Sequence, residues 1–210
     1  MYKILIFGPQ GAGKGTQAER LAKRLNLPAL SMGGLLREEQ ASGSTIGKQI
    51  VEIMTHGGLV SDQIALEVLK KRLEKADAKE GYIMDGYPRN MAQHQAYISF
   101  DQPTHVVVIE LSDEEAIRRL AGRRTCAKCG KIYHLDFAPP KVADVCDACG
   151  GELVQRPDDT PAAIQKRLDI YRNDTSPVSA EYEKMGVLHR VDGRGTMDQV
   201  EAEIAKILGV

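Results

Sequence analysis

The sequence predicts an α/β fold in which a doubly wound parallel sheet is covered by helices on both faces. Short apolar runs alternate with amphipathic stretches of helical spacing along most of the 210-residue chain. This alternation is typical of parallel strands joined by crossover helices. A glycine-rich loop joins the first apolar run to the first helical stretch. Because such folds bind ligands at the carboxyl ends of their strands, the loop marks the expected site.

Five apolar runs are expected to form the strands. They cover residues 3–7, 28–30, 82–84, 105–111 and 187–191. Apolar residues at helical spacing predict three of the helices. These residues are Ile64, Leu66, Val68, Leu69 and Leu73, then Ala162, Ile164, Leu168 and Tyr171, and finally Val200, Ile204 and Ile207. Each stretch presents one apolar face that can pack on the sheet.

Two segments interrupt the alternation and are expected to be inserts. The first, residues 32–61, is helical in character but carries glycine pairs at 33–34 and 57–58. The second, residues 122–159, has little helical periodicity and holds all four cysteines. The remaining residues, 1–31, 62–121 and 160–210, are expected to form the core. Glycines at the joints predict that both inserts move relative to this core, which favours a monomer.

The overall charge excludes some functions. The chain has 28 Lys and Arg against 29 Asp and Glu, so no global charge favours nucleic acid or a membrane as partner. No apolar run approaches the ~18 residues of a membrane span. The amino-terminal residues enter a strand directly and show no signal peptide, so a cytoplasmic protein is expected.

The glycine-rich loop is a candidate phosphate cradle. Its sequence is Gly8-Pro9-Gln10-Gly11-Ala12-Gly13-Lys14-Gly15-Thr16. Glycines such as Gly11, Gly13 and Gly15 let backbone N–H groups turn inward around an anion, and the following helix N-terminus adds partial positive charge. Lys14 adds a full charge. The pattern differs from G-x-x-x-x-G-K-[ST] in one respect, because the hydroxyl comes one residue later, at Thr16.

The cysteines form two C-x-x-C pairs. Cys126 and Cys129 are separated from Cys146 and Cys149 by sixteen residues, and a glycine follows each pair. This spacing is typical of a zinc site. Four thiolates make a closed tetrahedral site, so the metal is expected to be structural, with zinc favoured over iron. Disulfides and a redox motif are the competing interpretations, and a cytoplasmic location disfavours disulfides.

Charged residues near these motifs predict phosphoryl chemistry. Asp85 ends the third apolar run, where a carboxylate beside a phosphate cradle holds Mg²⁺ or its water shell. Arginines flank the cysteine insert at positions 119, 123, 124, 156 and 167. They could neutralise a moving phosphoryl group. No Ser-His-Asp or Cys-His set is suggested, and the five histidines are interpreted as structural. A phosphate acceptor is already an anionic nucleophile, so positioning and charge neutralisation suffice.

These motifs resemble those of one family. They are Gly8–Thr16, Leu35-Leu36-Arg37, Asp85-Gly86-Tyr87-Pro88-Arg89, Gly122-Arg123-Arg124, Arg156-Pro157-Asp158-Asp159, Lys166-Arg167-Leu168 and Val191-Asp192-Gly193. Over essentially its full length the chain resembles the long-form bacterial adenylate kinases that carry a four-cysteine zinc lid. The resemblance implies a P-loop nucleoside monophosphate kinase fold, with an acceptor-binding insert at 32–61 and a zinc-binding lid at 122–159. It also implies Mg²⁺-dependent, reversible phosphoryl transfer from ATP to AMP that gives two ADP and balances cellular adenine nucleotides.

The resemblance also assigns roles to residues. Donor-side residues would be Gly11, Gly13, Lys14, Gly15, Thr16, Arg119, Arg123 and Gly195, with Arg119 stacked on the ATP adenine. Catalytic residues would be Lys14, Arg123, Arg156, Arg167 and Asp85, and Asp158 and Asp159 would help to close the lid. AMP-binding residues would be Ser31, Met32, Arg37, Leu59, Val60, Gly86, Arg89, Gln93, Arg156 and Arg167. Arg37 and Arg89 would hold the AMP phosphate, and Gln93 would read the base.

Two alternatives stay open on the sequence. The family usually has Ser-Thr-Gly-Asp before the acceptor arginine, whereas this chain has Ser31-Met32-Gly33-Gly34. A kinase for UMP, CMP or GMP is therefore one alternative, although those enzymes usually have short lids. The other is a zinc-ribbon ATPase that binds nucleic acid. It would need a basic, aromatic surface around the cysteines, and the lysines of this segment are offset by Asp136, Asp144 and Asp147.

Overall fold

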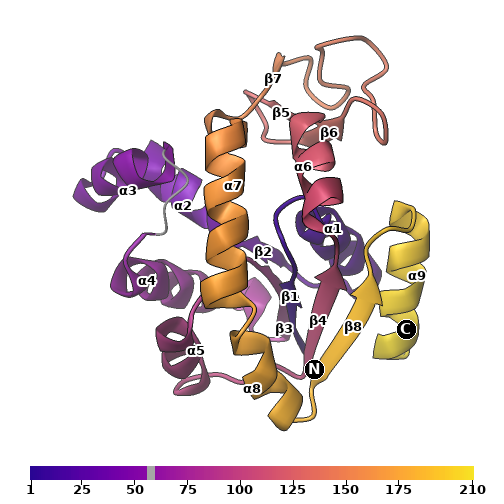
Figure 1. Cartoon of the computed structure of the whole chain (residues 1–210). Helices are drawn as coiled ribbons and strands as arrows, with labels where there is room; N and C mark the ends of the chain where they lie inside the picture. The colour runs from indigo at the N-terminus through magenta and orange to yellow at the C-terminus, as the bar shows by residue number, and fades with distance from the viewer. Residues whose placement is uncertain (56–59) are drawn as a thin grey trace.

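Five parallel strands form the central sheet of the computed structural model, which describes residues 1–55 and 60–210. In sheet order they are β2 (Ala29–Ser31), β3 (Gly81–Asp85), β1 (Tyr2–Phe7), β4 (His105–Glu110) and β8 (Leu188–Asp192). All five predicted strands are confirmed, with every boundary within one residue. Figure 1 shows that helices cover the sheet on both sides.

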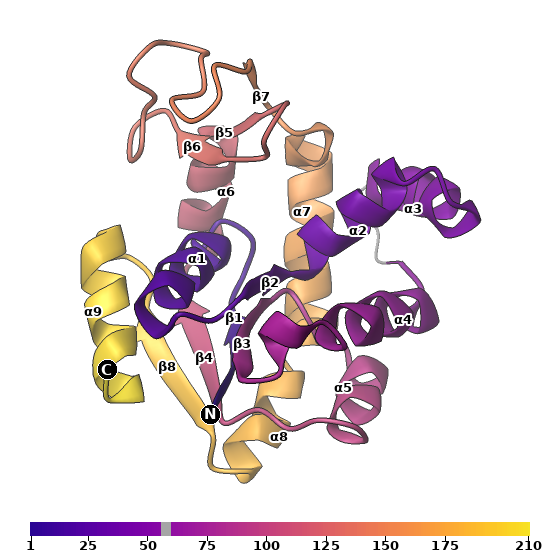
Figure 2. The ribbon, with the colours of Figure 1, turned by 180° about the vertical axis from the view of Figure 1, so that it is seen from behind.

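Alternating side chains of β1 explain the two layers. Ile4 and Ile6 belong to one buried cluster, and Leu5 and Phe7 belong to the other. Helices α1 (Lys14–Leu25) and α9 (Met197–Leu208) contribute to the first cluster. Helices α4 (Asp62–Leu73), α5 (Met91–Ile98) and α8 (Val178–Lys184) contribute to the second. Figure 2 shows α1 and α9 together on the side opposite α5 and α8. The doubly wound prediction is therefore confirmed.

The segment predicted as the first insert is helical. It contains α2 (Met32–Ala41) and α3 (Thr45–Thr55), which project to one side of the sheet in Figures 1 and 2. The side chain of Ser31 caps α2 by accepting a hydrogen bond from the N–H of Gly34 at 3.3 Å. The glycine pair at 57–58 and the predicted AMP contact Leu59 lie outside the described residues.

The cysteine segment contains a second, smaller sheet that the sequence did not predict. After α6 (Asp113–Ala121), strands β5 (Arg123–Cys126), β6 (Ile132–His134) and β7 (Leu153–Val154) pair antiparallel in the order β6-β5-β7. The chain then returns to the core through a 3₁₀ helix, η2 (Pro157–Asp159), and an α-helix, α7 (Pro161–Ile170). A π-helical turn at Tyr171–Thr175 follows. Figure 1 shows this sheet beyond the ends of α6 and α7. A short 3₁₀ turn, η1 (Ala76–Ala78), completes the elements.

Parallel strand register brings three motifs to one edge of the central sheet. Asp85, the last residue of β3, is aligned with Ser31 of β2 and Ile6 of β1. The glycine-rich loop leaves β1 immediately afterwards, at Gly8. The carboxyl ends of three strands therefore meet where the sequence predicts the site. Among the described residues, no helix has the length and apolar character needed to cross a membrane.

Candidate active site

The glycine-rich loop adopts the backbone geometry of an anion cradle. Gly13 has a φ of 84° and precedes α1, whose first N–H groups receive no side-chain cap. Gly8 has a φ of 143°, and a Cβ there would lie only 2.5 Å from the carbonyl oxygen of Ile109. Both positions therefore require glycine. The uncapped helix N-terminus leaves its N–H groups available to an anion.

Lys14 folds back over the loop. Its Nζ donates hydrogen bonds to the carbonyl oxygens of Gly8 at 2.9 Å and Pro9 at 2.8 Å. Burial lowers the pKa of Lys14 to about 8, and the nearby Asp85 carboxylate only partly opposes this shift. Lys14 is thus a desolvated cation at the loop, which an anionic phosphate would stabilise.

Asp159 holds two arginines together. Its carboxylate, fully buried, accepts from Arg123 Nε at 2.8 Å and Arg123 Nη2 at 2.5 Å. It also accepts from Arg167 Nη1 at 3.2 Å. Arg167 makes a further ion pair with Asp158 at 3.0 Å. The guanidinium groups of both arginines therefore converge on Asp159, and such groups bind carboxylates and phosphates with the same geometry.

The predicted cations from distant parts of the chain converge. Burial lowers the pKa of Arg37, Arg89 and Arg167, and it lowers that of Arg156 to about 10. The positive charges of neighbouring arginines lower these pKa values further. Because such repulsion weakens with distance, the arginines must lie close to one another. The cluster comprises the cations Lys14, Arg37, Arg89, Arg123, Arg156 and Arg167, with the carboxylates Asp85, Asp158 and Asp159. Six positive charges against three negative ones make a site suited to polyanions.

Asp85 lies beside the loop with one unused oxygen. A Cβ on Gly15 would be 3.5 Å from its Oδ2, which places the carboxylate against the first turn of α1. Its Oδ1 is buried and has no hydrogen-bond partner among the described residues. An unpartnered buried carboxylate oxygen next to a phosphate cradle fits a Mg²⁺ ion or one of its water ligands.

Residues of the expected acceptor side also lie together. The Arg89 Nε donates to the carbonyl oxygen of Gly86 at 2.8 Å, and the Arg89 backbone N–H donates to Gln93 Oε1 at 2.8 Å. The side chain of Met32 is buried in the core cluster, as is that of Val60. These two residues could therefore reach an acceptor only through their backbone groups.

The surroundings of Arg119 include two aromatic residues that the sequence analysis did not assign to the site. Arg119 Nε donates to Glu115 at 2.8 Å, and its guanidinium lies 5.7 Å from the centre of the Phe137 ring. The rings of Phe137 and His134 are 4.4 Å apart. His134 was interpreted as structural, and only the β5–β6 pairing brings it here. A Cβ on Gly122 would lie 2.5 Å from the His134 ring, so a larger residue at position 122 would displace this ring. Gly195, the other residue predicted to contact the nucleoside, directly precedes Thr196, the N-cap residue of α9.

The four cysteines form the predicted cluster. Their sulfurs all lie within 4.8 Å of one another, with Cys126 and Cys149 at 3.5 Å and Cys129 and Cys146 at 3.6 Å. These distances exclude disulfide bonds, which need about 2.05 Å. Tetrahedral zinc with Zn–S bonds of about 2.3 Å separates its sulfurs by about 3.8 Å. The cluster could therefore hold a metal ion. The glycines after each pair have the predicted positive φ of 74° and 68°.

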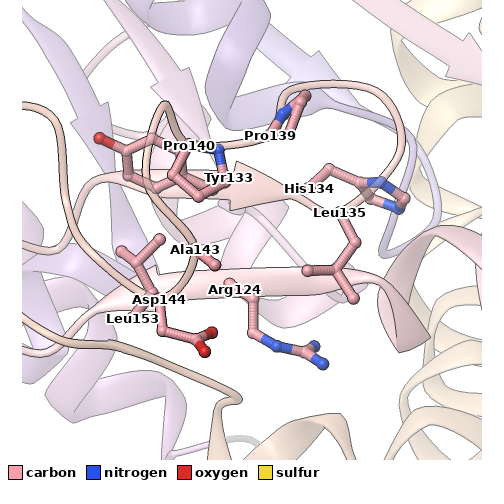
Figure 3. A pocket seen from close by; sticks show the side chains of 9 residues that line it. All are labelled: Arg124, Tyr133, His134, Leu135, Pro139, Pro140, Ala143, Asp144 and Leu153. Atoms are coloured by element: carbon pink, nitrogen blue, oxygen red, sulfur yellow. The ribbon is translucent and has the colours of Figure 1, made fainter.

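A cavity of about 230 Å³ lies in the same segment (Figure 3). Its lining consists of Arg124, Tyr133, His134, Leu135, Pro139, Pro140, Ala143, Asp144 and Leu153. Of the arginines that the sequence suggested for phosphoryl neutralisation, Arg124 alone lines this cavity.

Comparison with known proteins identifies the family. The family model described as adenylate kinase matches residues 6–187, which include the loop, the arginines and the cysteines. The chain belongs to the adenylate kinase family. It is 44% identical to an adenylate kinase of Pelobacter propionicus over 98% of this chain and 96% of that protein. It is 42% identical to one of Syntrophobacter fumaroxidans (98% and 99%) and 40% identical to one of Archaeoglobus fulgidus (98% and 97%).

Proposed function

We propose that this member of the adenylate kinase family transfers the γ-phosphoryl group of ATP reversibly to AMP, giving two ADP. The observation that carries the proposal is the convergence of six cations, five of them half-buried and the sixth, Arg37, more exposed, around Asp85, Asp158 and Asp159. Family membership and the adenylate kinase relatives support it. An uncharged substrate would leave these cations without the anionic partners that offset the free-energy cost of removing them from water.

The loop side is proposed to bind ATP. N–H groups of Gly11, Gly13 and Gly15 and the hydroxyl of Thr16 would surround its phosphates, and Lys14 would exchange its two carbonyl partners for phosphate oxygens. Asp85 would hold Mg²⁺ or its water ligands, and the ion, when bound, neutralises developing phosphate charge. Arg119, Gly195 and the nearby rings of His134 and Phe137 would contact the nucleoside.

The transferring phosphoryl group is proposed to replace Asp159 as the partner of Arg123 and Arg167. Asp159 keeps both guanidinium groups buried and oriented without nucleotide, so little reorganisation is needed when phosphate arrives. Arg156, which now donates to Thr125 Oγ1 at 3.0 Å, would join them. The AMP phosphate is itself an anionic nucleophile, so the residues position it and no general base is required.

The acceptor side is proposed to bind AMP. Arg37 and Arg89 would hold its phosphate, Gln93 would read its base, and Ser31, Met32, Leu59, Val60 and Gly86 would line the remainder. We also propose that residues 32–61 and 122–159 act as an AMP-binding insert and a lid, and that the cysteines bind a structural zinc ion. A monomeric state, a cytoplasmic location and the lack of a nucleic-acid partner stay predictions.

A coupled assay of ADP formation tests the proposal. ATP is combined with AMP, GMP, CMP or UMP in turn, with Mg²⁺ present. We expect AMP to be the preferred acceptor, because Gln93 offers a donor and an acceptor to the adenine edge. A higher kcat/KM for any of the other three nucleotides would contradict the proposal and support the corresponding kinase.

The pH dependence of ATP binding provides a second test. Lys14 has its pKa lowered to about 8, so it is charged below that pH and loses its charge above it. We therefore expect kcat/KM for ATP, which reports the free enzyme, to fall above about pH 8. Bound phosphate favours the charged lysine, so kcat should fall only at higher pH. A kcat/KM that stays flat up to about pH 9.5 would be inconsistent with this role of Lys14.

A further inference from the structure

Asp62 lies at the centre of a hydrogen-bond network next to the expected AMP site. Its Oδ1 accepts from Gln93 Nε2 at 2.9 Å and from Asn90 Nδ2 at 2.8 Å. Asn90 Oδ1 in turn accepts from the Gln93 backbone N–H at 2.8 Å. Gln93 is 3% exposed, so the network holds a buried amide. Asp62 begins α4, 31 residues before Gln93, and no motif of the sequence connects the two.

The two neighbours of the Gln93 amide fix which way it faces. A carboxylate at neutral pH only accepts hydrogen bonds, so the amide NH₂ must be the group that faces Asp62. The backbone N–H of Arg89 only donates, so the amide oxygen must face Arg89. A reversed amide would place NH₂ against an N–H and oxygen against a carboxylate. Both contacts would then be repulsive.

One donor and one acceptor of this amide stay available. Of the two N–H bonds on Nε2, one serves Asp62, and of the two lone pairs on Oε1, one serves Arg89. The remaining N–H and lone pair lie on the nitrogen and the oxygen of one planar amide. They match the adenine edge, where the ring N1 accepts and the exocyclic amino group donates. Hypoxanthine and guanine carry the opposite arrangement, with an N1–H donor and an O6 acceptor, and they match a reversed amide.

We propose that Asp62 is a positioning residue that locks the Gln93 amide in the orientation that selects adenine over 6-oxopurines. This inference rests on the proposed function, in which Gln93 reads the acceptor base. Asp62 touches no substrate in this scheme and acts only through Gln93. A locked amide loses little rotational freedom when the base arrives, so the lock should also strengthen AMP binding.

The test compares AMP with IMP, whose base has the reversed edge and no 2-amino group. In Asp62→Ala we expect KM for AMP to rise about three- to tenfold, the effect of one lost hydrogen bond, with kcat within about twofold. The ratio of kcat/KM for AMP to that for IMP should fall by about tenfold, because one of the two contacts that oppose a reversed amide is lost and only the Arg89 N–H still disfavours it. Asp62→Asn keeps a carbonyl acceptor and should recover most of both values.

Asp77→Ala is the matched control. Asp77 is an exposed aspartate of η1 that pairs with Arg72 of α4, and its loss should leave the AMP to IMP ratio unchanged. A purely structural role of Asp62 would lower the Tm of Asp62→Ala and leave this ratio as in the wild type. That outcome would overturn the proposal, as would an Asp62→Asn variant no better than Asp62→Ala.

A measurement without nucleotide separates this inference from the proposed function. The side-chain amide protons of Gln93 can be assigned by NMR through their loss in Gln93→Met. In ligand-free Asp62→Ala we expect these protons to exchange with solvent faster, at least about threefold, because one hydrogen bond is lost. Unchanged exchange would overturn the lock even in an active enzyme. A wild type that ignores AMP would overturn the proposed function, whatever the exchange rates show.

Discussion

Replacing Arg123 by alanine should lower kcat by a factor of about 10³–10⁵, the effect of removing an arginine that contacts a transferring phosphoryl group. Arg123 donates hydrogen bonds from Nε and Nη2 to the two carboxylate oxygens of the buried Asp159. This bidentate geometry is also the one in which a guanidinium binds a phosphoryl group. Phosphoryl transfer depends mainly on charge and position, so the loss should appear in kcat more than in KM for ATP. Steady-state and single-turnover rates in both directions measure it.

Two further variants separate catalysis from folding. Alanine at position 123 removes a partner of a buried carboxylate, which costs stability in its own right. Arg123→Lys keeps a charge beside Asp159 but not the planar fork, so it should fold well and still lose most of the rate. Arg124→Ala is the neighbouring control, because the Arg124 guanidinium donates to the carbonyl oxygens of Ala121 and Arg123 and forms no ion pair within the described part of the chain. A loss below about tenfold in a well-folded Arg123→Lys would contradict the assigned role.

Removing the proposed metal ion should unfold the segment 122–159 and leave the central sheet folded. The buried cluster of this segment consists of Cys126, Tyr133, Cys146 and Leu153, so half of its members are the proposed ligands themselves. Such a cluster is too small to fold alone, whereas zinc binding contributes roughly 10–16 kcal/mol in peptides of similar size. We expect chelation to release one metal ion per chain, to lower the Tm and to open this segment to proteolysis.

Cys129→Ser tests the same point without a chelator. Cys129 is exposed, so serine there removes a metal ligand and adds no buried polar group. Ala127→Ser places the same hydroxyl on an exposed neighbour and serves as control. Metal content, the melting curve and the cleavage sites within 122–159 are measured for both. Loss of the metal from Cys129→Ser with melting and cleavage like those of Ala127→Ser would show that the metal does not stabilise the fold.

The local patterns of the sequence determined the central sheet and the outline of the site. The three inner strands β1, β3 and β4 are apolar runs that the parallel sheet buries on both faces, so their composition alone revealed them. The loop from Gly8 to Thr16 and the four cysteines were recognisable because their chemistry depends on spacing over a few residues. The family resemblance followed from the same short motifs, and membership of the adenylate kinase family is confirmed.

Tertiary structure alone decided the contacts between distant residues. The small sheet of β5, β6 and β7 has strands of only two to four residues, which are too short to show a hydrophobic pattern. Arg123 and Asp159 are 36 residues apart, and Asp62 and Gln93 are 31 apart. His134 and Phe137 approach Arg119 only because β6 pairs with β5. A hydrogen bond requires its donor and acceptor atoms to lie within about 3 Å of each other. The number of residues between two distant positions does not determine the distance between them, so only the packing of the elements decides which of these contacts form.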